Sequence, residues 1–419
     1  MPASFLLLLA AQFASALADN ALLIVTIALL QDRGMAAWWA PLLKVGFIAS
    51  YVALAPFVGP LADAFPKARL MAWMNAVKVL GVAALLLGAH PVAAFVVVGL
   101  GAAAYAPAKY GLATELVRQD QLVAANGWIE VAAVCAVLLG TGLGGLLVSP
   151  SLLSAGAAAG QGLLAAAGPR LPSLLIVLAV YLVAGLLNLG VRDSGVRHAV
   201  DSIHPLALLR EFLAANRCLW RDRDGGLSLA VTTIFWGVGA TLQFAVLRWA
   251  NERLHLTLES AAFMQAAVAV GVIAGAAVAA RWVPLAQARR MLGAGVVFGL
   301  LMIAVAFIDT LAPAVVLLVT VGAVGGLMVV PLNALLQDRG YALLSAGRSV
   351  AVQGANENAS VLVFLGVYTG LVALDVPLMV LIVGLGAGVA GGLAALMLRE
   401  SLRERRGAQT GECPVDAKA

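Results

Sequence analysis

The chain has 419 residues, of which 63% are hydrophobic and only 11% are charged, and its mean hydropathy is +1.00. A soluble domain is closer to half apolar and a quarter charged, so this composition excludes a soluble protein and indicates a polytopic α-helical membrane protein. The net charge of +5 is then a signal of membrane topology and not of nucleic-acid binding. The three cysteines and four histidines show no metal-ligand spacing, so we expect no metal and no cofactor.

Apolar blocks of about 20 residues, the length that crosses the hydrocarbon core, recur along the whole chain. The first block imitates a signal peptide, but it lacks a basic n-region and continues past Asp19 to Leu30, so we expect a retained first helix. Polar and proline clusters divide the blocks into twelve predicted helices. Their spans are 4–31, 42–62, 70–89, 91–111, 121–148, 172–192, 227–248, 258–281, 291–308, 311–336, 349–373 and 376–398.

The long polar stretch 193–226 divides these spans into six and six. We therefore expect an N-terminal half over 1–192, a cytoplasmic linker over 193–226, a C-terminal half over 227–398 and a disordered cytoplasmic tail over 399–419. The Gly/Ala-rich segment between spans five and six predicts a loose periplasmic loop. Twenty Lys and Arg residues fall on the side of the two termini and four on the other side, which predicts that both termini are cytoplasmic.

Proline and acidic residues recur at corresponding places in the two halves. Pro107 aligns with Pro331 at an offset of 224, and Glu130 aligns with Glu357 at an offset of 227. Transporters built from parallel repeats show this pattern, and their sites lie between the halves near the membrane midplane. The sequence thus predicts an all-α integral membrane transporter of twelve helices in two six-helix halves.

The loop after the second span reads GPLADAFPKARL and contains Gly59, Asp63, Lys67 and Arg69. It resembles the signature of the major facilitator superfamily, although Phe65–Pro66 replaces the usual second glycine. In that family the glycine allows close helix packing, and the aspartate makes contacts that latch one conformation. The alternative is a charged turn that only fixes topology.

Ionisable residues inside the predicted spans are expensive to bury and therefore indicate a site, unless they only pair with each other or extend to the interface. Lys44 lies near the outer end of its span, where we expect it to snorkel, and Lys78 fits either interpretation. For four others we favour function, namely Asp19, Lys109, Glu130 and Glu357. Amides would supply hydrogen bonds, and the mixture of charges suits a zwitterion. These amides are Asn20, Asn126, Gln243, Asn333, Gln353, Asn356 and Asn358.

Seven stretches in chain order resemble the bacterial lysophospholipid transporter family: AQFASALADNALL, YVALAPFVGPLADAF, GAAAYAPAKYG, AANGWIE, FWGVGATLQF, VVPLNALLQDRG and AVQGANENA. The resemblance implies movement of lysophosphatidylethanolamine from the outer to the inner leaflet of the bacterial inner membrane. A cytoplasmic-side acyltransferase/acyl-carrier-protein synthetase would then reacylate it. The transporter itself would catalyse no reaction, and we expect a monomer.

The resemblance also implies roles for individual residues. Asp19 would bind the ammonium group, and Lys109 would bind the phosphate and neutralise Asp19 in the resting state. Gln243 stands where we expect a basic residue, so the anion site would rest on Lys109 or on Arg248. Further substrate contacts would come from Asn20, Gln243, Asn333, Gln353, Asn356 and Glu357. Residues that pair helices or switch conformation would be Gly59, Asp63, Lys67, Arg69, Asn126 and Glu130.

Other functions remain open at this point. A proton-coupled drug or polar-solute transporter of the same superfamily would use Asp19 or Glu357 as a proton carrier. A lipid acyltransferase or hydrolase would need a nucleophile and base, but the histidines lie in loops without an HxxxxD spacing. A scaffold without transport activity would leave the intramembrane charges unexplained.

Overall fold

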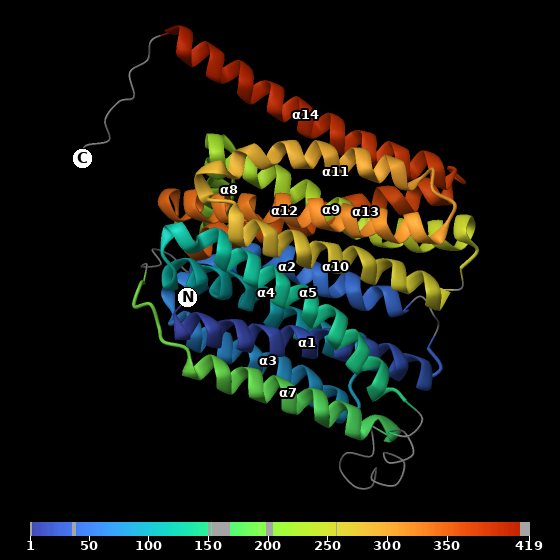
Figure 1. The fold of residues 1–419 in the computed structure, drawn as a ribbon. Coiled ribbons are helices and arrows are strands. Elements are labelled where there is room, and N and C mark those ends of the chain that lie inside the picture. Colours follow the sequence, from blue (N-terminus) through green and yellow to red (C-terminus); the bar gives the residue numbers. More distant parts are fainter. Residues whose placement is uncertain are drawn as a thin grey trace.

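The structure is a computed structural model that describes residues 2–35, 39–149, 152, 168–197, 204–256 and 258–410, with the side chains of 40–42, 258–263 and 403–410 left out. The described residues form helices and short 3₁₀ turns (Figure 1). In chain order they are α1 Ala3–Asp32, α2 Trp39–Ala64, α3 Lys67–Leu86, α4 Pro91–Leu116, η1 Gln119–Gln121, α5 Leu122–Leu147, α7 Leu171–Gly190, α8 Pro205–Arg221, α9 Arg223–Leu254, α10 Leu258–Trp282, η3 Leu285–Met291, α11 Leu292–Val305, α12 Leu311–Leu343, α13 Ala346–Ala373 and α14 Leu378–Thr410.

Each of the twelve predicted spans coincides with one long helix, which confirms the twelve-helix architecture. Eleven helices of the described part are long and apolar enough to cross a membrane. The remaining one is α13, whose polar run Gln353, Asn356, Glu357 and Asn358 lowers its hydropathy although its 28 residues suffice to span. The helix with the weakest apolar signal is therefore one that carries polar groups of the predicted site.

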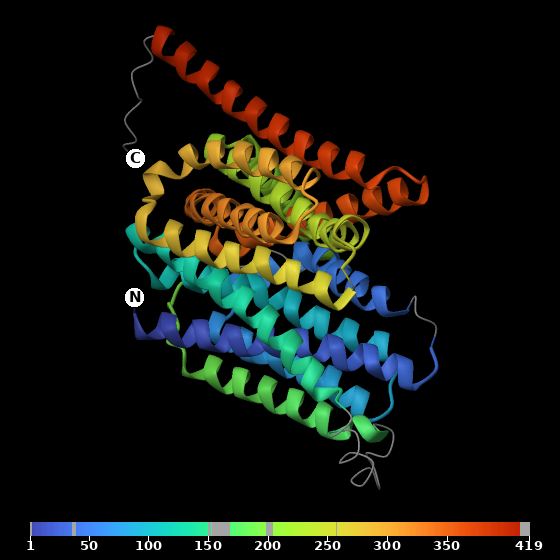
Figure 2. The same cartoon turned by 45° about the vertical axis from the view of Figure 1, so that its right-hand side comes forward.

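The helices form two groups that lie side by side in both views (Figures 1 and 2). Helices α1, α2, α3, α4, α5 and α7 make the first half, and α9 to α14 make the second. Each half has its own apolar core. A further cluster joins them, because Leu122 and Val123 of α5 pack with Ala276 of α10 and Val330 of α12.

Glycines set the closest approach of two helices, α10 and α12. A Cβ on Gly271 or Gly275 would lie 2.0 or 1.9 Å from the carbonyl oxygen of Val319 or Ala323, and one on Gly322 would lie 2.0 Å from that of Val268. Backbones this close leave no room for any side chain at the crossing. Small residues spaced by four are the usual means of packing helices in lipid.

Helix α8 occupies much of the segment expected as a linker. Its sequence places Leu208, Ala215 and Leu219 on one buried face, and Leu219 packs against Leu229 of α9. Proline at its first turn fits a helix start, because no backbone N–H partner is needed there. Residues 205–221 of the linker are thus a helix that packs against α9 and α13 of the second half and against α2 of the first.

The expectation of a disordered tail from residue 399 is wrong for residues 399–410, which continue α14 as helix. The run RESLRERR consists of good helix formers with alternating charge, and Arg223 Nε contacts Glu400 Oε2 at 2.6 Å. Residues 411–419 lie outside the described residues. The same holds for most of the predicted periplasmic loop, whose residues 150, 151 and 153–167 are not described.

Candidate functional site

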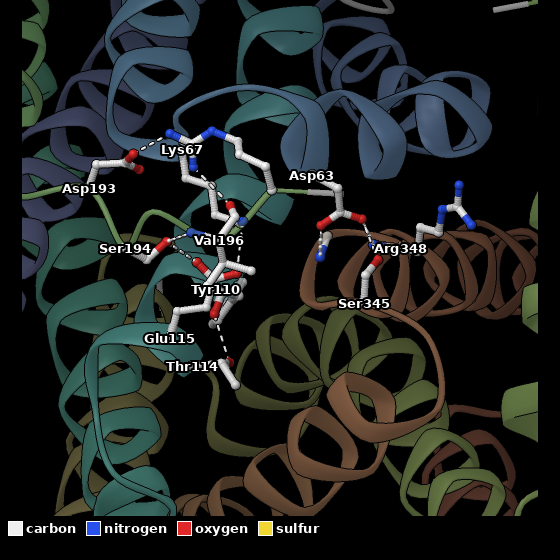
Figure 3. A network of polar contacts seen from close by, with 12 residues as sticks. Asp63, Lys67, Tyr110, Thr114, Glu115, Asp193, Ser194, Val196, Ser345 and Arg348 are labelled. Carbon is white, nitrogen blue, oxygen red and sulfur yellow. Dashed lines mark hydrogen bonds and ion pairs between the residues drawn. The ribbon is translucent and has the colours of Figure 1, made fainter. Parts of the chain in front are cut away.

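Asp63 holds the start of α13. Its carboxylate accepts hydrogen bonds from the hydroxyl of Ser345, from the N–H of Gly347 at 3.0 Å and from the N–H of Arg348 at 3.3 Å (Figure 3). A carboxylate at this place satisfies N–H groups that have no partner within the helix and interacts favourably with the helix dipole. The aspartate predicted as a latch therefore links α2 of the first half to α13 of the second.

Gly59 makes this contact possible. A Cβ at this position would lie 3.0 Å from Cα of Arg348 and 3.2 Å from the carbonyl oxygen of Gly347. Both residues belong to the first turn of α13. The absence of a side chain at Gly59 lets α2 approach α13 one turn before Asp63.

Lys67 and Arg69, the two basic residues of the same loop, have different surroundings. Lys67 is fully buried, and its Nζ lies 2.8 Å from Oε1 of Glu115 at the end of α4. The hydroxyl of Ser194 donates to the other oxygen of Glu115 at 2.5 Å (Figure 3). Arg69 is exposed. Lys67 thus ties helices within the first half, whereas Asp63 ties the two halves together.

Asn126 and Gln337 form a second link between the halves. Each side-chain amide donates to the other at 2.9 Å, and both residues are buried. Gln119 also donates to Asp338 at 2.8 Å. Together with Asp63 and Ser345, these residues define what we call the closed end of the bundle, which is the end that carries the start of α1.

At the opposite end, Lys44 of α2 donates to Oε1 of Gln243 on α9 at 3.4 Å. The Lys44 ammonium also lies 5.9 Å from the ring centroid of Phe244. All three residues are exposed, whereas Asp63, Asn126 and Gln337 at the closed end are buried. Lys44 supplies a cation beside Gln243, where the sequence lacks one, and its extension to the membrane interface stays a prediction.

Asp19 has Lys78 as its partner. Lys78 Nζ lies 2.8 Å from Oδ2 and 2.9 Å from Oδ1 of Asp19 and also donates to the hydroxyl of Ser15 at 2.9 Å. The hydroxyl of Tyr181 donates to Oδ1 of Asp19 at 2.7 Å. The expected resting-state pair of Asp19 with Lys109 is therefore wrong, because α3 places Lys78 directly against α1.

Aromatic rings complete the surroundings of this pair. Lys78 Nζ lies 5.3 Å from the ring centroid of Tyr105 and 5.5 Å from that of Tyr181. Lys78 is 2% exposed and Asp19 is 17% exposed. The carboxylate is thus the member of the pair that an approaching cation can reach.

Lys109, Glu130 and Glu357 form a second charged group, contributed by α4, α5 and α13. Lys109 is acted on electrostatically by both glutamates and also by Asp19. Glu357 accepts a hydrogen bond at 2.8 Å from Gln353, whose amide also contacts Oδ1 of Asn333 at 2.9 Å. The structure therefore brings together most of the residues expected to bind substrate, drawn from both halves.

Besides Gln243, which contacts Lys44 at the opposite end, two of the expected substrate contacts lie elsewhere. Asn20 donates to the carbonyl of Ala16 in its own helix at 2.8 Å, and its Cβ faces Gly140 of α5. Asn356 contacts α8, because its amide donates to Asn216 at 2.9 Å and accepts from the indole N–H of Trp220 at 3.2 Å. Asn356 thus points toward the linker helix and away from Glu357.

Two side chains of this system were not anticipated, Gln337 and Tyr181. Gln337 follows PLNALL in a stretch already recognised as distinctive, so its polar side chain in an apolar run was a usable signal. Tyr181 offered none, because a single tyrosine in an apolar span is ordinary. Among the described residues there is no group of three or more His, Cys, Asp or Glu that could hold a metal ion.

The arrangement offers both signs of charge at mid-helix depth, held between halves that are joined at one end. The sequence pattern of the Major Facilitator Superfamily matches residues 8–355. A protein of Citrobacter koseri named lysophospholipid transporter LplT is 38% identical over 391 residues, which are 93% of this chain and 94% of that protein. The chain belongs to the lysophospholipid transporter family of the major facilitator superfamily. A second relative of the same name, from Pectobacterium carotovorum, is 39% identical over 87% of this chain and 86% of its own length.

Solved structures of superfamily transporters share the fold. A bacterial homologue of the iron transporter ferroportin, in an outward-facing state, has a TM-score of 0.69 with 13% identity and covers 96% of this chain and 100% of its own. The transporter FucP in an outward conformation has a TM-score of 0.63 with 20% identity, over 93% and 97% of the two chains. At these sequence identities the similarity supports the fold and no further property. In the described part of this chain, buried hydrogen bonds join the two halves at the closed end.

Proposed function

We propose that this protein moves lysophospholipid, lysophosphatidylethanolamine in particular, from the outer to the inner leaflet of the bacterial inner membrane by alternating access. Its termini and closed end would face the cytoplasm, in agreement with the excess of Lys and Arg there. The observation that carries the proposal is the mixed-charge group of Asp19 and Lys78 beside Lys109, Glu130 and Glu357. It lies in a chain whose curated relatives are named lysophospholipid transporters.

A zwitterionic head group fits such a site for an electrostatic reason. Charges at this depth are costly unless they are paired, and a head group with one ammonium and one phosphate adds no net charge. The ammonium would approach Asp19, the more exposed member of its pair. The phosphate would approach Lys109, with Gln353 and Asn333 as hydrogen-bonding neighbours of Glu357.

The contacts between the halves suggest how the site changes sides. Substrate would enter from the end opposite the closed end, where the exposed side chains of Lys44 and Gln243 meet. The halves would then rock, which would break the cap of Asp63 on α13 and the amide pair of Asn126 with Gln337. Release would deliver lipid to a cytoplasmic-side acyltransferase/acyl-carrier-protein synthetase, and a single copy of the chain would suffice.

Uptake of labelled lysophosphatidylethanolamine into spheroplasts tests the proposal. Cells with the protein should take up label faster than cells without it, and Asp19→Asn should abolish the difference at equal membrane abundance. Asp309→Asn is the matched control, because Asp309 is exposed in a loop. Uptake of a polar solute in place of lipid, which collapses with an uncoupler, would instead support the proton-coupled transporter.

A further inference from the structure

The second half contains an apolar pocket that the central charged group does not use. It lies between α9, α13 and α14 and has a volume of about 370 Å³. Its walls include Phe364, Val367, Leu371, Leu381 and Leu385. The volume is within the range of small-molecule sites, roughly 300–1,000 Å³. It is therefore large enough to hold part of a lipid chain.

Missing side chains on α14 create this space. Gly384 lines the pocket, and a Cβ built on it would meet no atom within 4 Å. The exposed apolar residues Val367 and Val380, at 57% and 58% exposure, show that the pocket opens to the surroundings of the bundle. In a membrane protein those surroundings are lipid.

A guanidinium stands at the rim of the pocket. Arg248 follows the lining residue Ala245 on α9 by about one turn and interacts with the hydroxyl of Tyr368, which also lines the pocket. Its Nε donates to Oε1 of Glu252 at 2.5 Å. Its Nη1 is buried and has no hydrogen-bond partner. The rim thus presents one free buried donor and a pair of opposite charges.

The pocket and its rim together match a lipid with one acyl chain and a zwitterionic head group. We propose that the pocket binds the acyl chain of a lysophospholipid whose phosphate contacts Arg248, as a reception site before the head group moves to the central charged group. This inference rests on the proposed function for its substrate class. Arg248 is close to the end of α9 that lies opposite the closed end, so the site would face the leaflet from which substrate comes.

Charge complementarity favours this occupant over an uncharged apolar one. The unpartnered Nη1 of Arg248 would donate a hydrogen bond to a phosphate oxygen, and Glu252 would attract the ammonium. A single pocket of this volume accommodates one chain, and the second chain of a diacyl lipid would have to remain outside. A diacyl lipid or a detergent molecule is therefore an outcome to be separated in the test.

The test measures binding of lysophosphatidylethanolamine to the full chain in nanodiscs. Gly384→Phe should weaken binding of the palmitoyl form by about tenfold or more, because burial of each methylene contributes to affinity. The same variant should leave binding of the hexanoyl form unchanged. Gly391→Phe is the matched control on the same helix, since Gly391 is also open and lies outside the pocket. Arg248→Gln should weaken both forms, whereas Arg253→Gln should not.

A second measurement needs no variant and therefore does not depend on whether the variants fold. Wild-type protein is irradiated with lysophosphatidylethanolamine that carries a diazirine at the end of its chain, and adducts should map to α13 and α14 around Phe364 and Leu385, the lining residues farther from Arg248. Adducts elsewhere, equal competition by diacyl phosphatidylethanolamine, or unchanged affinity of Gly384→Phe would overturn the pocket assignment. If adducts map to the pocket but spheroplasts take up no lysolipid, the proposed transport fails and the binding site stands.

Discussion

Lys78 on α3 holds Asp19 on α1 with its ammonium nitrogen 2.8 Å from the carboxylate, and Tyr181 on α7 donates to the same carboxylate. Three helices of the first half therefore meet at one acidic side chain. Removing one partner of a buried pair leaves the other charge uncompensated, which costs more than the pair contributes. The pair thus has a structural role in the resting state, whatever binds to Asp19 later.

Variants of the pair separate that structural role from substrate binding. Asp19→Asn and Lys78→Gln should each lower membrane abundance. Each should also lower the free energy of unfolding, by about 3–5 kcal/mol if the pair behaves as fully buried. The double variant should recover abundance, because no unpaired charge remains, yet it should transport no lysolipid. Quantitative blots and uptake assays measure the two effects. A double variant with wild-type uptake would show that Asp19 only pairs with Lys78.

The cap of Asp63 on α13 predicts a shift between conformations. Asp63→Ala removes the acceptor for two backbone N–H groups and for Ser345, and loss of a cap costs about 0.5–2 kcal/mol. The closed end should therefore open more often. Labelling of a cysteine placed at the buried Ala334, in a background without native cysteines, measures this opening. Arg69→Gln, in the same loop but exposed, should leave the labelling rate unchanged.

The crossing of α10 and α12 predicts a sharp steric limit. Gly275→Val should prevent accumulation of folded protein or lower its melting temperature strongly, because overpacking typically costs about 1–3 kcal/mol and here the obstacle is backbone. Gly388→Val on α14 is the control, since a Cβ there meets no atom within 4 Å. Equal melting temperatures for the two variants would contradict the close approach of α10 and α12 at Gly275.

The stabilising effect of Asp222, which precedes α9, should not depend on pH near neutrality. Hydrogen bonds from Arg339 hold the pKa of the Asp222 carboxyl below its ordinary value, and the N–H of Gly225 also donates to it at 2.8 Å. A carboxyl with a lowered folded-state pKa stabilises above its unfolded pKa of about 3.9 and loses that effect only as pH falls through the folded value.

The melting-temperature difference between wild type and Asp222→Ala should therefore stay constant from about pH 8 to pH 5. It should shrink only in more acidic solution. Differential scanning fluorimetry in detergent measures it. A difference that already changes near neutral pH would mean that Arg339 does not stabilise the charged form of Asp222.

The sequence predicted the helices well because lipid imposes long apolar runs on every spanning segment. It also predicted the place of Asp63, since a local motif marks it. It could not predict which cation neutralises Asp19, because Lys78 and Lys109 both lie in spans and only the packing of α3 on α1 decides between them. Asn356 was misplaced for the same reason. Its position three residues after Gln353 allowed a shared face, but α8 packs on the side where Asn356 points.

The sequence of α8 contains a pattern that predicts a helix. Leu208, Phe212, Ala215 and Leu219 recur with the period of an amphipathic helix inside the stretch expected as linker. The pairing of Asn126 with Gln337 was less accessible. The offset of 227 that aligns Glu130 with Glu357 places Asn126 opposite Gln353 of α13, whereas Asn126 contacts Gln337 of α12.

Leaflet exchange by the purified protein tests the central claim most directly. The protein is reconstituted into liposomes whose outer leaflet contains fluorescent lysophosphatidylethanolamine, and the fraction protected from an external quencher is followed over time. The account predicts that protection rises faster than in protein-free liposomes, for lysolipid but not for diacyl phosphatidylethanolamine, and that Asp19→Asn removes the increase. Equal rates with and without the protein would contradict it.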